Sequence, residues 1–171
     1  MIQQVVASDD PVIFFEPKRR YWEKAEVDTD APLPDPASLW QARVVRSGTD
    51  ATLVAYGPMV RTCLDAAAAA EDEGRSLEVL DLRSLAPLDF ATVLASVRRT
   101  KRAVVVHEAP RNVGLGAEIA ARLSEQLYYE MEAPVLRVTG FDTPYPPSRL
   151  EEEYLPDLDR VLHAVDRSLA Y

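Results

Sequence analysis

The chain has little of the residue types that form disulfides and metal sites. Its 171 residues include one cysteine, Cys63, and two histidines, His107 and His163. A single cysteine excludes an internal disulfide, which fits a reducing compartment, and we expect the protein in the cytoplasm. Cys63 lies in an alanine-rich helical stretch without an adjacent histidine, so a buried structural thiol is favoured over a nucleophile. The histidines are far apart in the sequence, and no group of residues has the spacing of a metal site.

Long apolar runs and an excess of positive charge are also absent. No run reaches the roughly 18 apolar residues that a membrane span needs. The first residues, Met1 to Gln4, lack the basic segment and apolar core of a secretory signal. With 19 Lys and Arg against 28 Asp and Glu, the formal net charge is -9. Nucleic acid and anionic membranes are therefore poor partners, and a basic protein is the better expectation.

From residue 42 onward, short apolar strands alternate with helical stretches. Asp89 is placed to cap a helix, and Gly74 is placed to end one with a positive φ. Alternation of this kind predicts a three-layer α/β/α fold around a mostly parallel sheet. The expected strands are 42–46, 52–56, 77–82, 102–107 and 134–139, and the expected helices are 60–73, 90–99, 116–129 and 158–169.

The first 41 residues read differently. Val12–Phe15 is a short apolar run between prolines, which is typical of a strand inside a parallel sheet. For the basic and aromatic patch 18–22, a packed junction is favoured over a phosphate contact. Asp28–Pro36 is acidic and contains Pro32, Pro34 and Pro36, so it predicts an extended linker at a domain boundary.

Two motifs near residue 110 have both a functional and a structural interpretation. His107 and Glu108 end a strand, where a histidine could act as a base oriented by the glutamate. No nucleophile accompanies them, so a hydrogen-bonded pair at a domain or subunit interface is favoured. Gly114 and Gly116 resemble half of a nucleotide fingerprint, but Ile119 occupies the third glycine position, which favours turn glycines.

The C-terminal third contains two candidate contact regions. The loop Phe141–Pro147 combines two aromatic residues with three prolines and predicts a rigid contact surface, either between subunits or over a site. Tyr171 directly follows the last helix, so its carboxylate either pairs with a cation of a partner or lies in solvent. The run Glu151–Glu153 is interpreted as a solvated face rather than a cation site.

Several longer motifs, taken together in their order along the chain, resemble a known family. The chain resembles the C-terminal portion of the β subunit of branched-chain 2-oxo acid dehydrogenases, the thiamine-diphosphate-dependent first component of a multienzyme complex. The first and last motifs favour this type over the similar pyruvate dehydrogenase β subunit. The matching segments are Val12–Lys18, Gly48–Gly57, Glu78–Arg83, His107–Pro110, Glu132–Pro134 and Gly140–Pro146.

The resemblance implies a transketolase C-terminal-type domain over residues 42–171, with a five-stranded mixed sheet. Residues 1–27 would be the last strand and junction of a preceding pyrimidine-binding domain, and 28–41 a proline-rich linker. In the resembled family, the catalytic groups lie in the part of that domain that this chain would lack, and the α subunit binds the diphosphate and magnesium. We therefore expect no catalytic, cofactor-binding or metal residues in this chain, and no decarboxylase activity of the chain alone.

The resemblance also implies partners and contact residues. The partners would be the α subunit, a second β subunit, and the small basic subunit-binding domain of the dihydrolipoyl acyltransferase, which accepts the acyl group. Glu132 and Tyr171 correspond to the acyltransferase-docking residues. The alternatives are a β subunit that acts on pyruvate or another 2-oxo acid, and a non-catalytic α/β interaction module. The expected subunit-interface residues are His107, Glu108, Phe141, Asp142, Thr143, Pro144 and Tyr145.

One short segment departs from the resembled family. The family commonly has a double glycine after the His-Glu-Ala-Pro turn, where this chain has Val113 and Gly114. Leu115 stands where an aromatic residue is usual. These departures concern the conformation of the loop and leave the expected fold unchanged.

Overall fold

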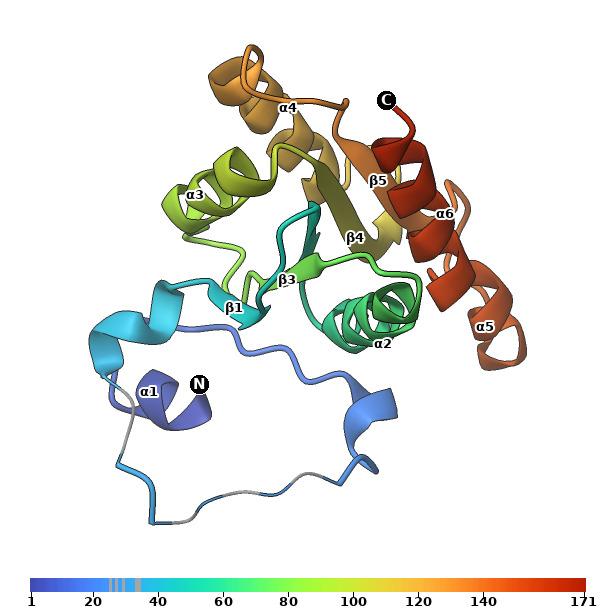
Figure 1. Cartoon of the computed structure of the whole chain (residues 1–171). Helices are drawn as coiled ribbons and strands as arrows, with labels where there is room; N and C mark the ends of the chain where they lie inside the picture. Colours follow the sequence, from blue (N-terminus) through green and yellow to red (C-terminus); the bar gives the residue numbers. More distant parts are fainter. Residues whose placement is uncertain (25, 27, 29, 33–34) are drawn as a thin grey trace.

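A computed structural model describes residues 1–24, 26, 28, 30–32 and 35–171. Pro34 of the predicted linker lies outside the described residues, as do residues 25 and 27 of the predicted N-terminal remnant. Figure 1 shows a central sheet flanked by helices, with the N-terminal segment forming a wide loop beside it.

The sheet has five strands in the order β1-β3-β2-β4-β5. Parallel pairing joins β2 to β3, β2 to β4 and β4 to β5, while β1 pairs with β3 in the antiparallel direction. The predicted mostly parallel, mixed sheet is therefore confirmed. The strands are β1 (Arg43–Arg46), β2 (Ala51–Ala55), β3 (Leu77–Asp81), β4 (Ala103–Pro110) and β5 (Leu136–Gly140).

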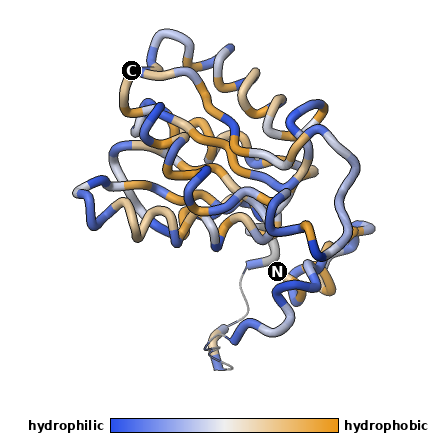
Figure 2. The backbone as a smooth tube through the Cα atoms, turned by 90° about the vertical axis from the view of Figure 1, so that its right-hand side faces the viewer, coloured by the Kyte–Doolittle hydropathy of each residue, from blue (hydrophilic) through white to orange (hydrophobic). Residues whose placement is uncertain are grey.

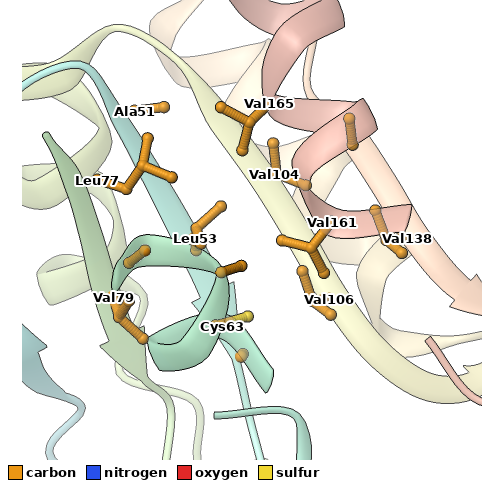
Figure 3. Packing of buried hydrophobic residues seen from close by; sticks show 14 of the residues in the cluster. Ala51, Leu53, Cys63, Leu77, Val79, Val104, Val106, Val138, Val161 and Val165 are labelled. Carbon is orange, nitrogen blue, oxygen red and sulfur yellow. The ribbon is translucent and has the colours of Figure 1, made fainter. Parts of the chain in front are cut away.

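Two helices cover each face of the sheet, which makes the three layers. One face packs against α2 (Met59–Asp72) and α6 (Leu158–Leu169), and the other against α3 (Phe90–Thr100) and α4 (Leu115–Leu127). The hydrophobic strands lie between the helices in Figure 2. Figure 3 shows Cys63 among the apolar side chains of the first face, so the predicted structural thiol is buried as expected.

The helix signals predicted from the sequence operate in the structure. The Asp89 carboxylate accepts the backbone N–H of Thr92 at 3.1 Å and so caps α3. After α2, Gly74 has φ +78° and turns the chain toward β3. Both signals act through local backbone geometry, which explains why they can be located without knowledge of the tertiary structure.

The N-terminal part differs from the prediction in two ways. Val12–Phe15 forms no strand, and the side chains of Ile13 and Phe15 are 81% and 85% exposed, because no neighbouring strand lies beside them. Within the predicted linker, Pro36–Trp40 forms a 3-10 helix that buries Leu39. Short helical segments also occur at α1 (Ile2–Val6), Lys18–Arg20, Ser148–Leu150 and α5 (Glu151–Tyr154).

The strand predicted over 102–107 is longer than expected. β4 continues through His107 to Pro110, with an irregular register against β5 between these two residues. A proline is tolerated there because it terminates the ladder. In the described part of the chain, no helix has the length and apolar composition needed to cross a membrane.

Candidate docking groove and the carboxyl edge of the sheet

A groove of about 560 Å³ lies between α4, the segment that leads into β5, and the C-terminal residue. Its lining is mostly apolar. Glu132 and Tyr171, the two residues predicted to dock an acyltransferase, both contribute to it, so the structure brings them together across 39 residues of sequence. Their docking role stays a prediction. The lining residues are Ala120, Ala121, Ser124, Tyr128, Met131, Glu132, Ala133, Pro134, Val135 and Tyr171.

Glu132 is held by the turn that follows α3. This helix ends at Thr100, and the capping residue Lys101 has a φ of +59°, which turns the chain out of the helix. The Lys101 carbonyl accepts the Glu132 backbone N–H at 3.0 Å. Lys101 Nζ lies 3.0 Å from one carboxylate oxygen, and the Arg102 guanidinium binds the other. The hydrogen bonds from these two cations hold the pKa of Glu132 below its ordinary value.

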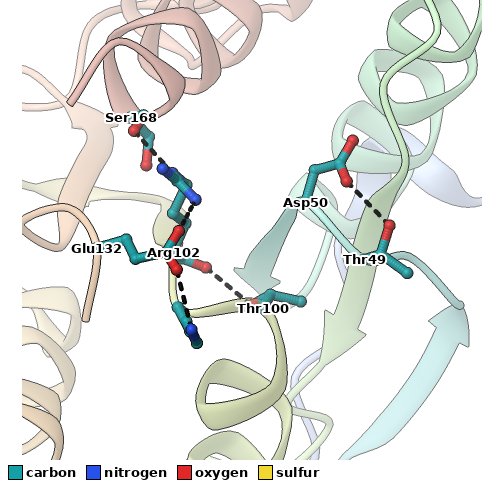
Figure 4. Close-up of polar contacts among 7 residues, drawn as sticks. Thr49, Asp50, Thr100, Arg102, Glu132 and Ser168 are labelled. Carbon is teal, nitrogen blue, oxygen red and sulfur yellow. Dashed lines mark hydrogen bonds and ion pairs between the residues drawn. The ribbon is translucent and has the colours of Figure 1, made fainter. Parts of the chain in front are cut away.

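The partly neutralised state of Glu132 was not foreseen. The net charge of -9 favoured a basic partner, but two cations of the same chain already contact this carboxylate. Figure 4 shows Arg102 between Glu132 and Ser168, whose carbonyl accepts the Arg102 Nε–H at 3.1 Å. A partner that contacts Glu132 would therefore share it with Lys101 and with Arg102, and Arg102 also holds the end of α6.

At the carboxyl edge of the sheet, His107 is fully buried and does not bond to Glu108. Its Nδ1 lies 3.1 Å from the Ala109 carbonyl and its Nε2 accepts the Gly116 N–H at 3.2 Å, which together require the neutral Nδ1–H form. The predicted His107–Glu108 hydrogen bond is thus wrong, because the ring turns inward toward the first turn of α4. The ring also stacks on Tyr56 at a centroid distance of 5.9 Å.

Glu108 points toward the N-terminal segment instead. Arg19 Nη1 lies 3.8 Å from its Oε1 atom, which has no hydrogen-bond partner among the described residues. Burial raises the pKa of Glu108, and the nearby Arg19 and Arg20 oppose this. Its side chain is 31% exposed, so of the two residues only Glu108 has surface with which to contact a subunit.

The loop expected at a subunit interface is exposed throughout residues 141–145. Asp142 accepts the Asn112 backbone N–H at 2.7 Å, which ties this loop to the turn after β4. Phe141 lies under the Arg160 guanidinium at 4.7 Å, and Tyr145 donates to Glu151 at 2.9 Å. The structure therefore places the loop beside Glu108, on the same edge, while its interface role stays a prediction.

A buried polar cluster that was not predicted from the sequence lies at the opposite end of the strands. The Glu78 carboxylate is 1% exposed and binds Ser96 and Arg99, with Thr52 Oγ1 at 3.3 Å. A glutamate at a core position of β3 was the available signal, because a buried carboxylate needs partners. All of its partners come from the neighbouring β2 and α3, so the cluster is explained as a structural one.

The described residues do not fit the cofactors of the resembled family. Among them, no group of three or more His, Cys, Asp or Glu side chains could hold a metal ion. Among the described residues, neither the groove nor the carboxyl edge of the sheet offers a carboxylate cluster suited to magnesium. No step of chemistry through thiamine diphosphate is therefore assigned to these residues.

Comparison with known proteins places the chain in a family. Residues 41–161 match the family described as "Transketolase, C-terminal domain". Because this match covers more than half of the sequence, the chain belongs to the transketolase C-terminal domain family. A protein described as a split gene transketolase, an inactive β4 tetramer, has a similar fold, with a TM-score of 0.69 and 31% identity over 84% of this chain and 45% of that one.

Curated relatives are named as dehydrogenase β subunits. "Pyruvate dehydrogenase E1 component subunit beta" of Leifsonia xyli is 62% identical over 100% of this chain and 50% of its own length. "3-methyl-2-oxobutanoate dehydrogenase subunit beta" of Mycobacterium tuberculosis is 54% identical over 99% and 48%. A "2-oxoisovalerate dehydrogenase subunit beta" of Pseudomonas aeruginosa is 43% identical over 95% and 49%. The chain spans about half the length of the curated relatives that it matches.

Proposed function

We propose that this chain forms the C-terminal half of the β subunit of a cytoplasmic, thiamine-diphosphate-dependent 2-oxo acid dehydrogenase. In this role it serves subunit assembly and docks the acyltransferase component. The names of the relatives support the class of enzyme, and they divide between pyruvate and branched-chain acids. We retain a branched-chain 2-oxo acid as the substrate, with pyruvate as the alternative. A comparison of both substrates on the complete α/β enzyme separates the two.

One observation carries the docking proposal. Glu132 and Tyr171 line the same mostly apolar groove, although they come from different parts of the chain. An apolar floor with a carboxylate at its edge suits a small basic domain, because burial supplies affinity and charge supplies orientation. The proposed interface to the α subunit and the second β subunit includes Glu108 and the loop 141–145, which are exposed together at the carboxyl edge of the sheet.

The test replaces Glu132 by lysine and measures binding of the recombinant subunit-binding domain by calorimetry at low salt. We expect Glu132→Lys to raise the Kd about tenfold or more, since it puts a third cation beside Lys101 and Arg102. The matched control is Glu130→Lys, which changes the charge equally. Glu130 pairs with Arg98 and lies outside the groove lining. Equal weakening by both variants would contradict a docking role for the groove.

A further inference from the structure

We propose that Arg102 is the positioning residue of the docking groove, which it builds by fastening Glu132 to the end of α6. This inference rests on the proposed docking function and adds a residue to it. Arg102 does not line the groove itself. It acts through the two elements that do, the segment that contains Glu132 and the C-terminal residues after Ser168.

Two side chains among the described residues bind Glu132, and of these Arg102 is the one that also contacts α6. Its Nη1 atom donates to Glu132 Oε2, and its Nε atom donates to the Ser168 carbonyl at 3.1 Å. Ser168 lies in the last turn of α6, where helix carbonyls have no intrahelical donor. Arg102 therefore satisfies an orphan carbonyl and a carboxylate with one planar group, as Figure 4 shows.

The guanidinium is itself held in place. Only 19% of the Arg102 side chain is exposed, against 51% for Lys101. The Arg102 carbonyl accepts the Thr52 N–H at 2.9 Å and the Thr100 hydroxyl at 3.1 Å, so the main chain at this point is part of the sheet. A rigid backbone with a mostly buried side chain fixes the distance between Glu132 and α6.

Lys101 has the same charge and contacts the same carboxylate but performs a different task. Its ammonium lies 3.0 Å from Glu132 Oε1, and this is its only ion pair among the described residues. The lysine side chain has a flexible stem and a compact charge, so its contact does little to fix the position of the Glu132 carboxylate. A cation of the partner would bind the same carboxylate oxygen. Lys101 therefore competes with the partner for Glu132.

This difference gives a charge-matched experiment. Arg102→Gln and Lys101→Gln each remove one positive charge from the same carboxylate. In the 171-residue chain, we measure the Kd for the recombinant subunit-binding domain by calorimetry and amide exchange at residues 169–171 by mass spectrometry. We expect Arg102→Gln to raise the Kd about tenfold and to speed exchange at the C-terminus. Lys101→Gln should leave exchange unchanged and leave the Kd unchanged or lower it.

The following outcomes test the positioning role of Arg102. Equal affinities for the two variants, or equal exchange at residues 169–171, overturn the positioning role. If the wild-type chain does not bind the domain, the proposed docking function fails, and the exchange comparison alone then decides whether Arg102 fastens α6. If circular dichroism shows that Arg102→Gln does not fold, Arg102→Lys replaces it. An ammonium keeps the charge but reaches only one of the two groups, the Glu132 carboxylate or the Ser168 carbonyl. The same faster exchange is then expected, and its absence overturns the proposal.

Discussion

Val113 adopts a backbone conformation that glycine occupies more easily. Its φ is +60°, in the left-handed region, and its side chain is fully exposed. A β-branched residue is rarely found there, because its Cβ branches crowd the following carbonyl. The loop therefore retains at Val113 the conformation expected from a double glycine, although the sequence departs from that pattern.

Replacing Val113 by glycine should stabilise the folded chain by about 0.5–1 kcal/mol. Relief of the left-handed strain, about 1–2 kcal/mol, outweighs the greater freedom that glycine gains in the unfolded chain. Urea unfolding followed by circular dichroism measures the difference. Arg111→Gly is the control, because Arg111 is not among the described residues with a positive φ. Arg111→Gly should slightly destabilise the folded chain. An equal gain in stability in both variants would argue against backbone strain at Val113.

His107 is the residue from which we expect a pH dependence. Burial holds its pKa below the ordinary value of 6.5, and Arg137 acts in the same direction. Below about pH 6.5, His107 therefore binds a proton in the unfolded chain but stays neutral in the folded chain. The stability that this histidine contributes is complete above that pH and is lost as the pH falls toward the lowered pKa of the folded state.

The change His107→Gln should remove this loss. Between about pH 7 and pH 5, the free energy of unfolding of the wild type should fall more than that of the variant. The carboxylates titrate in both proteins, so the difference between the two slopes isolates the histidine. Denaturant titrations at both pH values give this difference. A steeper fall in the variant would mean that His107 is protonated in the folded chain.

At the scale of elements, the contact between β4 and α4 depends on Gly116. Its N–H donates to His107 Nε2, and a Cβ placed on it would overlap the His107 ring. Gly116→Ala should therefore destabilise the chain by about 1–3 kcal/mol, although alanine favours a helix by about 1 kcal/mol. Thermal unfolding measures the change. The exposed Glu118→Ala in the same helix should stay within about 0.5 kcal/mol, and a stabilised Gly116→Ala would exclude the steric contact.

The elements that the sequence predicted are those whose signals are local. The helix over 158–169 was located to the residue, because its apolar spacing acts within one helix. The prediction of a strand at Val12–Phe15 was wrong, because an apolar segment forms a strand only where a neighbouring strand pairs with it. The Lys101, Arg102 and Glu132 cluster was missed, because about 30 residues separate its members and only the fold joins them.

At the scale of the whole molecule, the N-terminal segment exposes apolar side chains that the described residues do not cover. Ile13, Phe15 and Trp22 are 81%, 85% and 90% exposed. Such surface favours association with other chains. In the proposed enzyme, the half that the relatives have in addition to this chain would cover it.

We expect the chain alone to self-associate through this segment. Changing both Ile13 and Phe15 to serine should lower the weight-average mass in sedimentation equilibrium toward that of a single 19.0 kDa chain. Tyr129→Ser is the control, since Tyr129 is 97% exposed but lies on another part of the molecule. If the double variant and the control have the same average mass, association does not proceed through residues 12–15.

The position of Tyr171 in the groove lining also guides how the protein should be handled. An affinity tag or fluorescent protein fused behind this residue would begin inside the groove and would compete with any domain that binds there. Met1 lies at the opposite end of the molecule in Figure 1. Purification handles and surface-immobilisation anchors are therefore best attached at the amino terminus, where the groove remains open to ligands.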